Sequence, residues 1–470
     1  MPVLEQAHEC LPVRSLSGWG RTSHSSCRVI QPRGVAEVLE SLAAHAGDAG
    51  VIARGAGRSY GDAAQNDGGT VLDMTALDRI VSIDPENRLV RAQAGATIAQ
   101  LMARLAVHGL TLPVVPGTRH VTLAGAIASD IHGKNHHRDG GFARHVAALS
   151  LCTPAGEVLE VTPDNGADLF YATLGGMGLT GVVVEATVRA EPLPSAWVAA
   201  DTDRTDGLEQ TLQLMSGEER SRYSVAWLDL LADGAAMGRA IVSRADQLPA
   251  DGLAPPLGRR RAGAAFPGAL SRQPVFDVPR GFPAALLRRS SVRAFNALRW
   301  RSAPRRERGR PTALTPYFFP LDAVGAWNRL YGSCGLVQYQ FAIPLGAEDA
   351  LERCFQLIRA RRLPIYLAVF KRLGAAFGGP LSFPLRGWTL AVDIPAAAHG
   401  LQSALNELDE LVAGAGGRVY LSKDARLGRD ALNAMYPQLD RFRAQRERVD
   451  PDGVLRSDLA LRLGLCGATG

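Results

Sequence analysis

Over residues 34–190, short apolar blocks with strand and helix periods alternate and are separated by turns. Alternating apolar and polar residues on both sides of Pro85 predict a hairpin. Thr97 can cap a helix, because apolar residues at 98, 101, 102 and 105 follow it with helical spacing up to Gly109. Residues 157–191 add a second hairpin, a helix that runs into glycines and a long β-branched strand. This half of the chain is therefore predicted to be α+β.

Beyond Pro192 glycine-rich turns become fewer, and the apolar pattern changes to that of sheet strands. The stretches LVQYQFAIP, LPIYLAVFK and GWTLAVDIP alternate or are apolar over a short span. A helix is expected over LQSALNELDELVAGAGG, before the segment RVYLSKDAR. From these changes we predict a cofactor domain at residues 1–195, a substrate domain at 196–412 and a C-terminal return to the first domain at 413–470.

The composition is that of a globular enzyme large enough for two or three domains, with 470 residues of which 46% are hydrophobic and 21% charged. The six cysteines include no CxxC pair, which argues against a structural zinc site and favours a reducing compartment. We find neither a secretory signal nor an apolar run of about 18 residues. A cytoplasmic location is therefore expected.

The basic charge is concentrated in one segment. Residues 255–310 contain 14 arginines against Asp277 and Glu307, whereas the whole chain has a net charge of only +6. Nucleic-acid binding would need aromatic platforms or a recognisable binding fold around this charge, and the sequence has neither, so we expect no nucleic-acid partner. The segment fits a mobile insertion near anionic lipid or phosphate about as well as a solvated flexible loop.

Lysine is scarce in a chain that has 49 arginines. The three lysines are Lys134, Lys371 and Lys423. An ammonium is a compact point donor whose pKa burial can shift, so these positions are candidates for chemistry that a planar guanidinium cannot perform. The alternative is that three surface lysines have survived by chance, and the residues around each of them decide between the two.

Three loops of small residues suggest a site for a long cofactor. In RGAGRSYGD, residues 54–62, three glycines allow successive backbone N–H groups to point into one concavity that can bind a diphosphate. The loop is not a Walker loop, because the GK(S/T) ending is absent, and it is not a good Rossmann fingerprint, because Tyr60 takes the place of the third glycine. Residues 113–137 and 174–181 add two further loops of this kind. Together they are what an extended dinucleotide needs along its length.

In this order the three loops resemble the flavin domain of the vanillyl-alcohol oxidase type of flavoprotein, in which FAD lies between two α+β subdomains. The motifs GRSYGDAAQN, DIHGKNHH, GLTG, QYQF, PLSFPLRGW, SKDAR, MYP and VDP are similar to those of the decaprenylphosphoryl-β-D-ribose 2′-oxidase family. The resemblance runs from residue 17 to the C-terminus and is looser in the arginine-rich segment. It implies an α+β fold with a two-subdomain FAD-binding domain and an antiparallel-sheet substrate domain.

The resemblance also implies how FAD is bound. It puts the first loop at the diphosphate, the second beside the flavin, Val183 at the adenine side and Tyr420 at the ring. Many relatives attach FAD to a histidine where this chain has Arg58, so we expect non-covalent FAD. The implied cofactor-binding residues are Arg54, Gly55, Ala56, Gly57, Arg58, Ser59, Tyr60, Gly61, Asp62, Gly117, Thr122, Leu123, Ala124, Gly125, Ser129, Asp130, Ile131, His132, Val183 and Tyr420.

In the family that the chain resembles, the three lysines line the pocket over the flavin. There they bind a substrate phosphate and favour a negatively charged reduced flavin. A secondary alcohol must lose a hydride to the flavin and a proton to a base or to water. The candidate catalytic residues are Lys423 first, then Tyr60 and His132, and the candidate substrate-binding residues are Lys134, Gln338, Gln340, Lys371, Asp393 and Phe318.

The first hypothesis is FAD-dependent oxidation of the 2′-hydroxyl of polyprenylphosphoryl-β-D-ribose to the 2-keto sugar. This is the first half of an epimerisation to the arabinose donor of cell-wall arabinan, completed by a separate NAD-dependent keto-reductase. The lipid substrate implies a peripheral place at a membrane surface, with the periplasmic face an alternative to the cytoplasmic one. The second hypothesis is a flavin oxidase of a soluble sugar alcohol or aldonolactone, and the third is a non-catalytic lipid-phosphate or RNA-binding protein.

The histidine cluster has a competing interpretation as a zinc site. His132, His136 and His137 could supply nitrogens to zinc together with His120 or His145. No carboxylate or cysteine pattern accompanies them, so we predict no metal and expect His136 and His137 to bond to the backbone.

Two departures from the family concern the substrate. Phe318 and Phe319 stand where a Tyr-His pair is usual, and Ala391 stands where relatives have a cysteine.

Overall fold

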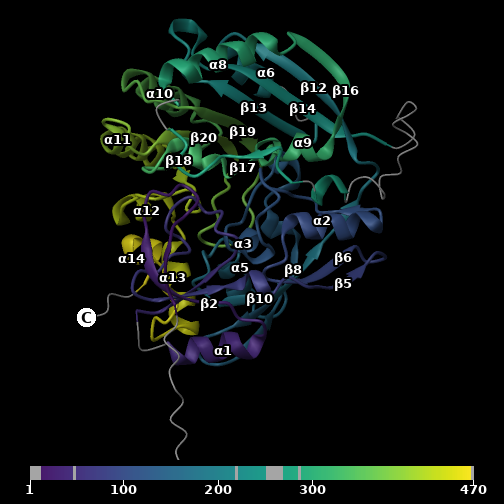
Figure 1. The fold of residues 1–470 in the computed structure, drawn as a ribbon, viewed down its shortest axis with the longest axis vertical. Helices are drawn as coiled ribbons and strands as arrows, with labels where there is room; N and C mark the ends of the chain where they lie inside the picture. Colours follow the sequence, from purple (N-terminus) through teal and green to yellow (C-terminus); the bar gives the residue numbers. More distant parts are fainter. Residues whose placement is uncertain are drawn as a thin grey trace, which may run out of the picture.

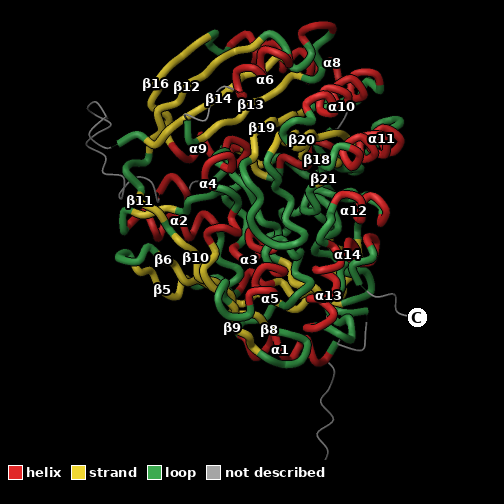
Figure 2. Tube along the Cα trace, turned by 180° about the vertical axis from the view of Figure 1, so that it is seen from behind, coloured by secondary structure: helices red, strands yellow, loops and turns green. Residues whose placement is uncertain are grey.

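The computed structural model describes residues 12–45, 49–216, 221–249, 268–271, 273–283 and 287–466. It contains a lower body with two smaller sheets and an upper body built on one large sheet (Figure 1). Seen from behind, much of the region between the two bodies consists of loops (Figure 2). Helices and largely antiparallel sheets are mixed in both bodies, so the predicted α+β class is confirmed.

The lower body holds a four-stranded and a five-stranded sheet. The first has the order β1 (Val13–Leu16), β2 (Ser25–Ile30), β4 (Thr70–Asp73), β3 (Val51–Arg54), with β2 and β3 parallel to β4. The second is antiparallel, in the order β5 (Ile80–Asp84), β6 (Leu89–Gln93), β10 (Val182–Arg189), β8 (Val146–Cys152), β9 (Val158–Val161). The hairpin predicted around Pro85 is confirmed as β5 and β6, whereas the second one lies earlier than predicted, because β9 pairs with the preceding β8 rather than with a strand inside residues 157–191.

Short helices pack around these two sheets. They are α1 (Val35–Ala44), α2 (Ile98–Val107), α3 (Leu123–Ala128) and α5 (Ala167–Thr173), whereas α4 (His136–Asp139) contacts β19 of the upper sheet, which spans Leu367–Leu373. The predicted cap of α2 is confirmed as a capping box, in which the Thr97 hydroxyl accepts from the Gln100 N–H and the Gln100 side chain accepts from the Thr97 N–H. Its apolar stripe, Ile98, Leu101 and Leu105, is fully buried.

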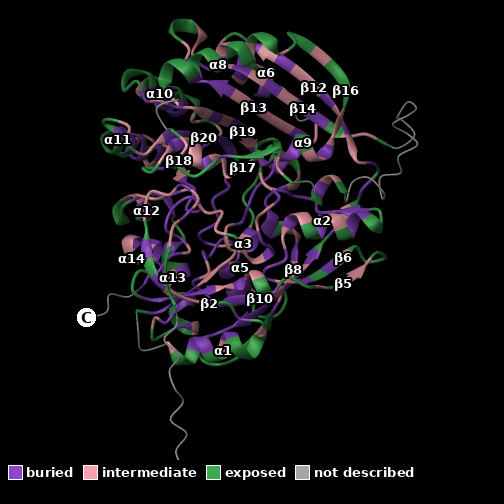
Figure 3. Cartoon of the chain, viewed as in Figure 1, coloured by how far each residue is buried: buried purple, intermediate pink, exposed green. Residues whose placement is uncertain are grey.

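The upper body is an eight-stranded antiparallel sheet against which helices pack. Its order is β16 (Arg306–Ala313), β12 (Trp197–Thr205), β14 (Arg239–Gln247), β13 (Tyr223–Asp229), β19 (Leu367–Leu373), β20 (Gly387–Pro395), β18 (Leu336–Pro344), β21 (Arg418–Val419). The helices are α6 (Leu208–Ser216), α8 (Arg289–Ser302), α10 (Glu348–Ala360) and α11 (Leu401–Gly414). Buried residues follow the strands and the region where the bodies meet (Figure 3).

Two details differ from the sequence pattern. The strand expected from residue 363 begins at Leu367, because Pro364 has no N–H to give to a sheet. The short strand β21 extends the upper sheet beyond residue 412, where we predict the substrate domain to end. The division into three segments stays a prediction.

The C-terminal helices α12 (Arg429–Met435), α13 (Leu439–Val449) and α14 (Asp458–Leu463) lie against the lower body (Figure 1). Arg462 of α14 binds both oxygens of Asp62 at 2.7 and 2.9 Å, and it lies 2.8 Å from Asp424. One guanidinium thus joins the first glycine loop to the segment that carries Lys423.

Of the predicted mobile insertion, residues 255–267, 272 and 284–286 lie outside the described residues. The remaining part includes α8 and the start of β16, which pairs with β12. Neither element was expected, because arginines at most exposed positions hide the apolar period. Among the described residues, no helix has both the length and the apolar character needed to cross a membrane.

Candidate active site

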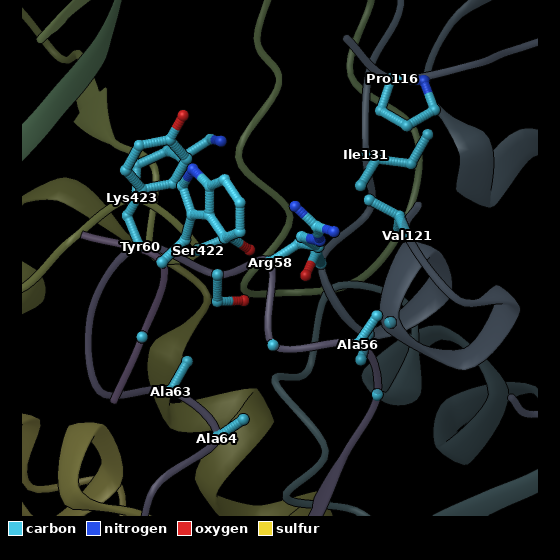
Figure 4. Close-up of a pocket in the computed structure, with 18 of the residues that line it drawn as sticks. Ala56, Arg58, Tyr60, Ala63, Ala64, Pro116, Val121, Ile131, Ser422 and Lys423 are labelled. Carbon is cyan, nitrogen blue, oxygen red and sulfur yellow. The ribbon is translucent and has the colours of Figure 1, made fainter. Parts of the chain in front are cut away.

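A large cavity lies where the loops of the lower body meet one face of the upper sheet. Its walls come from the first loop (residues 53–61), the second (116–132), the third (177–183), strands β18 to β20 and residues 420–423. Figure 4 shows Tyr60, Ser422 and Lys423 on one side, Val121 and Ile131 on the other and Arg58 between them. Three loops that are far apart in the sequence therefore form one site, as their composition predicts.

The first loop needs its glycines, because other parts of the chain approach it closely. A Cβ on Gly55 would lie 2.1 Å from the Thr122 hydroxyl oxygen, and Gly57 has a φ of +63°. The same Thr122 caps α3 by accepting from the N–H of Gly125. Arg54 is held by the carbonyl oxygens of residues 17 and 64. The loop and the start of α3 thus form a cradle of small residues, which suits phosphate groups.

A positive group with unused hydrogen-bonding capacity faces the cavity. Arg58 is largely buried, and its guanidinium carbon lies 4.2 Å from the centre of the Trp19 ring. Its Nε has no hydrogen-bond partner within the described part of the chain. Burial lowers the pKa of Arg58, and the charge of Asp322 is the main effect that opposes it. A buried cation of this kind favours an anionic or electron-rich ligand.

Met74, Val183 and Ala124 give the cavity apolar walls, whereas Tyr420 lies beside the sheet, where its N–H donates to the carbonyl oxygen of Gln340. A cavity with apolar walls, a cradle of small residues and a group of polar side chains fits an extended cofactor with a central diphosphate. The predicted residues that line it are Arg54, Gly55, Ala56, Gly57, Arg58, Ser59, Tyr60, Gly61, Gly117, Thr122, Ala124, Gly125, Ser129, Ile131, His132, Val183 and Tyr420.

The sheet closes the cavity with polar side chains around His132. Lys371 Nζ lies 3.0 Å from His132 Nδ1, and Gln340 Nε2 lies 2.9 Å from His132 Nε2. Burial, reinforced by Lys371, keeps the pKa of His132 well below its usual value. Burial and the neighbouring Lys134 and Lys423 lower the pKa of Lys371 to about 7.

Lys423 lies on the opposite side of this polar end. Its Nζ is 4.0 Å from the centre of the Tyr60 ring, a cation–π contact that favours the ammonium. Burial lowers the pKa of Lys423 to about 8, and Asp393 opposes the shift. Asp393 lies behind the cavity wall, where Gln338 Nε2 donates to it at 2.5 Å, and burial raises its pKa to about 7.

Some predicted site residues point away from the cavity. Lys134 donates to the carbonyl oxygen of Tyr317 and lies 4.1 Å from the centre of its ring, behind Lys371. Phe318 packs edge to face on Tyr223, with ring centres 5.0 Å apart. Neither residue is among those that line the cavity.

Three predicted cofactor-binding residues support the loops rather than line the cavity. Asp62 is bound by Arg462, and Leu123 is buried in the core on α3. Asp130 accepts from Ser382 and from the N–H of Ala143, and burial raises its pKa to about 6.

The other histidines of the cluster bond to the backbone, as expected. His136 Nδ1 accepts from the N–H of Gly374 at 3.0 Å, and His137 Nε2 lies 3.0 Å from the carbonyl oxygen of Ser221. Within the described ranges, no group of three or more histidine, cysteine, aspartate or glutamate side chains is arranged to hold a metal.

Sequence reasoning missed several residues of the cavity wall. Trp19 and Trp327 come from distant segments, and their rings meet edge to face with centres 5.9 Å apart. Met177 and Ser422 lie inside or beside recognised motifs, but nothing in those motifs singles them out. Trp19 and Trp327 can be recognised as part of the site only from their contact in the folded structure.

Comparisons with known proteins agree with this geometry. The model of the FAD binding domain family matches residues 27–162, and that of D-arabinono-1,4-lactone oxidase matches residues 394–463. A decaprenylphosphoryl-beta-D-ribose oxidase of Mycolicibacterium smegmatis is 41% identical over 464 residues, covering 96% of this chain and 98% of the relative. An L-gulono-1,4-lactone dehydrogenase of Mycobacterium tuberculosis is 27% identical over 460 residues, covering 95% and 98%. An L-gulonolactone oxidase of Bos taurus is 33% identical over 177 residues, covering 37% and 40%.

Proposed function

The chain belongs to the decaprenylphosphoryl-β-D-ribose oxidase family, and on that premise we propose that it oxidises the 2′-hydroxyl of polyprenylphosphoryl-β-D-ribose to the 2-keto sugar. It is an FAD-dependent oxidoreductase of the vanillyl-alcohol oxidase type that acts on CH–OH groups. The observation that carries the substrate proposal is the polar end of the cavity, where Lys371 and Lys423 flank His132 beside the diphosphate cradle. Two lysines in the cavity wall suit a substrate that is both a phosphate ester and an alcohol.

The residues present fit FAD. Arg54 to Gly61 would hold the diphosphate, Thr122 and Gly125 the adjoining part, Val183 the adenine side and Tyr420 the ring. When bound, FAD supplies the two-electron acceptor that takes a hydride from the alcohol carbon. The chain's own residues bind the phosphate, orient the sugar and take up the proton of the hydroxyl.

We propose Lys423, Tyr60 and His132 as the catalytic group and Gln338, Gln340 and Lys371 as residues that orient the sugar. Lys423 provides positive charge near the oxygen that loses its proton, and Lys371 lies beside His132 at the same end of the cavity. Asp393 acts from behind through Gln338, whose amide it fixes. Lys134 adds charge behind Lys371, and Phe318 shapes the adjoining core.

The 2-keto product needs a second reaction, because the epimerisation is complete only when the ketone has been reduced again. A separate NAD-dependent keto-reductase would reduce the ketone from the other face and complete the epimerisation to the arabinose donor of cell-wall arabinan. The second candidate function is oxidation of a soluble aldonolactone or sugar alcohol. The relatives named for aldonolactones support it, at 27% identity over the full length and 33% over about a third of the chain.

A prenylated substrate calls for a peripheral place at a membrane, since each CH₂ resists transfer to water by about 0.8 kcal/mol. Helix α8 carries exposed apolar side chains, Phe295 and Leu298, among exposed arginines that include Arg301. Apolar groups surrounded by positive charge suit a surface of anionic lipid. We place the protein on the cytoplasmic face in this proposal, with the periplasmic face as the alternative.

Anaerobic mixing with a short-chain prenylphosphoryl ribose tests the proposed function. We expect the visible flavin band to bleach, because the 2′-hydroxyl carbon gives up a hydride while dioxygen is absent. L-gulono-1,4-lactone serves as the matched substrate of the second candidate. Bleaching by the lactone together with a persistent yellow spectrum in the prenylphosphoryl sugar would overturn the first proposal in favour of the second.

Non-covalent binding of FAD gives a second test. Arg58 occupies the place of the attaching histidine, and a guanidinium packed on Trp19 offers no nitrogen suited to a bond with the flavin. Unfolding in denaturant followed by ultrafiltration should therefore release all of the yellow colour into the filtrate. Colour that stays with the polypeptide after this treatment would contradict the prediction.

A further inference from the structure

A buried chain of hydrogen bonds leads from Thr389 on β20 to Lys371 on β19. The Thr389 hydroxyl donates to the carbonyl oxygen of Phe341 at 2.8 Å. A hydroxyl has one proton, so Thr389 must accept its other contact, which is Nε2 of Gln340 at 3.1 Å. The side chains of Thr389 and Gln340 are almost completely buried, so water does not provide alternative partners.

This contact sets the orientation of the Gln340 amide. If the amide were reversed, Thr389 would face two oxygen acceptors with a single proton, and one of the two oxygen–oxygen contacts would have none. The amide nitrogen therefore points toward Thr389. The same nitrogen lies 2.9 Å from Nε2 of His132, so its second proton is donated there. Nε2 of His132 is an acceptor and carries no proton.

His132 must then carry its proton on Nδ1. The ring is neutral, because its Nε2 accepts and because burial beside Lys371 keeps its pKa well below the usual value. Nδ1 lies 3.0 Å from Nζ of Lys371, to which its N–H must donate. An ammonium has no lone pair and cannot accept this bond, whereas a neutral amine can. The hydrogen-bond directions thus require an uncharged Lys371.

The charges around Lys371 favour the same state. Lys134 and Lys423 both repel a proton on Lys371, and His136, which also faces it, is held neutral by burial. Lys423 differs, because Asp393 and the ring of Tyr60 favour its ammonium. Of the two lysines that line the cavity, Lys371 loses its proton first.

We propose that Thr389, Gln340 and His132 hold Lys371 as an uncharged amine, and that this amine takes the proton of the substrate hydroxyl. The catalytic step rests on the function proposed above. When the substrate binds, the single lone pair of Nζ turns from the His132 N–H to the substrate hydroxyl, the O–H bond breaks, and its proton goes to Nζ of Lys371, which becomes an ammonium. The C–H electron pair leaves with its hydrogen as hydride to bound FAD, which is reduced, and the carbon becomes a ketone. Thr389 and Gln340 are positioning residues, and Lys423 remains the cation of the site.

NMR of the FAD-loaded protein with ¹³Cε-labelled lysine and ¹⁵N-labelled histidine tests the charge directly. The chain has three lysines, so three signals are expected, and Lys134→Arg and Lys423→Arg assign them. In the wild type we expect Lys371 to titrate at about 7, below Lys423, and His132 to carry its proton on Nδ1. A Lys371 midpoint above that of Lys423, or a proton on Nε2 of His132, would overturn the proposal.

Thr389→Val and Thr389→Ser form a matched pair. Valine keeps the shape without the hydroxyl, so the Gln340 amide can reverse, His132 can donate from Nε2, and Nδ1 can accept from a Lys371 ammonium. We expect the Lys371 midpoint to rise by about one pH unit or more, a tenfold change in its protonation equilibrium. Serine restores the hydroxyl and should restore the wild-type midpoint and tautomer. Identical titrations in the two variants would contradict the proposed chain.

The pH dependence of flavin reduction links the charge to the reaction. A base must be free of its proton, so the rate of anaerobic flavin reduction should rise with pH through the Lys371 midpoint. In Thr389→Val the pH at which the reduction rate rises should shift upward together with that midpoint. If the pH dependence of the rate stays in place while the Lys371 midpoint moves, Lys371 is excluded as the proton acceptor. The NMR measurement needs no substrate. A result that shows a charged Lys371 would therefore leave the proposed oxidation untouched. If the protein did not oxidise the prenylphosphoryl ribose, the charge measured on Lys371 would still be valid.

Discussion

Lys423→Ala should leave FAD bound and abolish reduction of the flavin by the substrate. The Nζ of Lys423 contacts the face of the Tyr60 ring and none of the glycines that form the diphosphate cradle, so its loss does not disturb cofactor binding. It does remove the lysine of the cavity whose positive charge Asp393 and the Tyr60 ring support against the effect of burial. Loss of one preorganised stabilising group typically costs about 10²–10³ in rate, and we expect at least that reduction.

The visible spectrum measures FAD occupancy, and stopped-flow mixing under anaerobic conditions measures the rate of bleaching. Lys423→Arg separates charge from shape, because a guanidinium keeps the charge but spreads it over a planar group. We expect this variant to recover part of the rate. Arg429→Ala serves as the control, since this cation lies close in sequence but donates to backbone carbonyls at the surface. Normal turnover in Lys423→Ala would exclude its catalytic role.

The site could be predicted from the sequence where its chemistry is local. The glycines of the first loop reveal a cradle, because few other functions require three glycines among small residues in nine positions. The scarcity of lysine pointed to Lys371 and Lys423, and both line the cavity. The hairpin at Pro85 and the cap at Thr97 follow from local periodicity and capping rules, and both elements are present.

What the sequence could not reveal depends on contacts between distant segments. Lys134 belongs to the same lysine set, yet its direction is decided by the carbonyl of Tyr317, 183 residues away. Trp19 meets Trp327 only because the upper body folds over the first loop. The role of Thr389 depends on a hydrogen bond to Gln340 across two strands. None of these contacts is indicated by a periodic pattern or a motif in the sequence.

The contact between the first loop and the Lys423 segment holds the catalytic group together. Tyr60 donates its N–H to the carbonyl oxygen of Ser422 at 3.0 Å, and Arg462 clamps Asp62 and Asp424 from outside. The Tyr60 ring and the Lys423 ammonium, which come from opposite ends of the chain, are thereby kept in contact. Cofactor binding and the position of Lys423, the proposed catalytic lysine, therefore depend on the same backbone contact between the two segments.

Gly61→Ala should break this contact and release FAD. A Cβ on Gly61 would lie 1.8 Å from the carbonyl oxygen of Asp424, a distance that no side-chain rotation relieves because the neighbour is backbone. The loop must then move away from residues 422–424. We expect a loss of about 3 kcal/mol in the free energy of unfolding, typical of severe overpacking, and little or no bound flavin.

Denaturant unfolding followed by fluorescence measures the stability of this variant, and the ratio of flavin to protein absorbance measures occupancy. Gly428→Ala is the matched control, because a Cβ there has no heavy atom within 4 Å and the residue has an ordinary negative φ. Its cost should stay below about 1 kcal/mol, the usual range for glycine to alanine at a helix N-cap. A Gly61→Ala protein as yellow and as stable as Gly428→Ala would mean that the loop can shift without loosening the cradle. In that case the close packing of the two segments would not be what holds Tyr60 against Lys423.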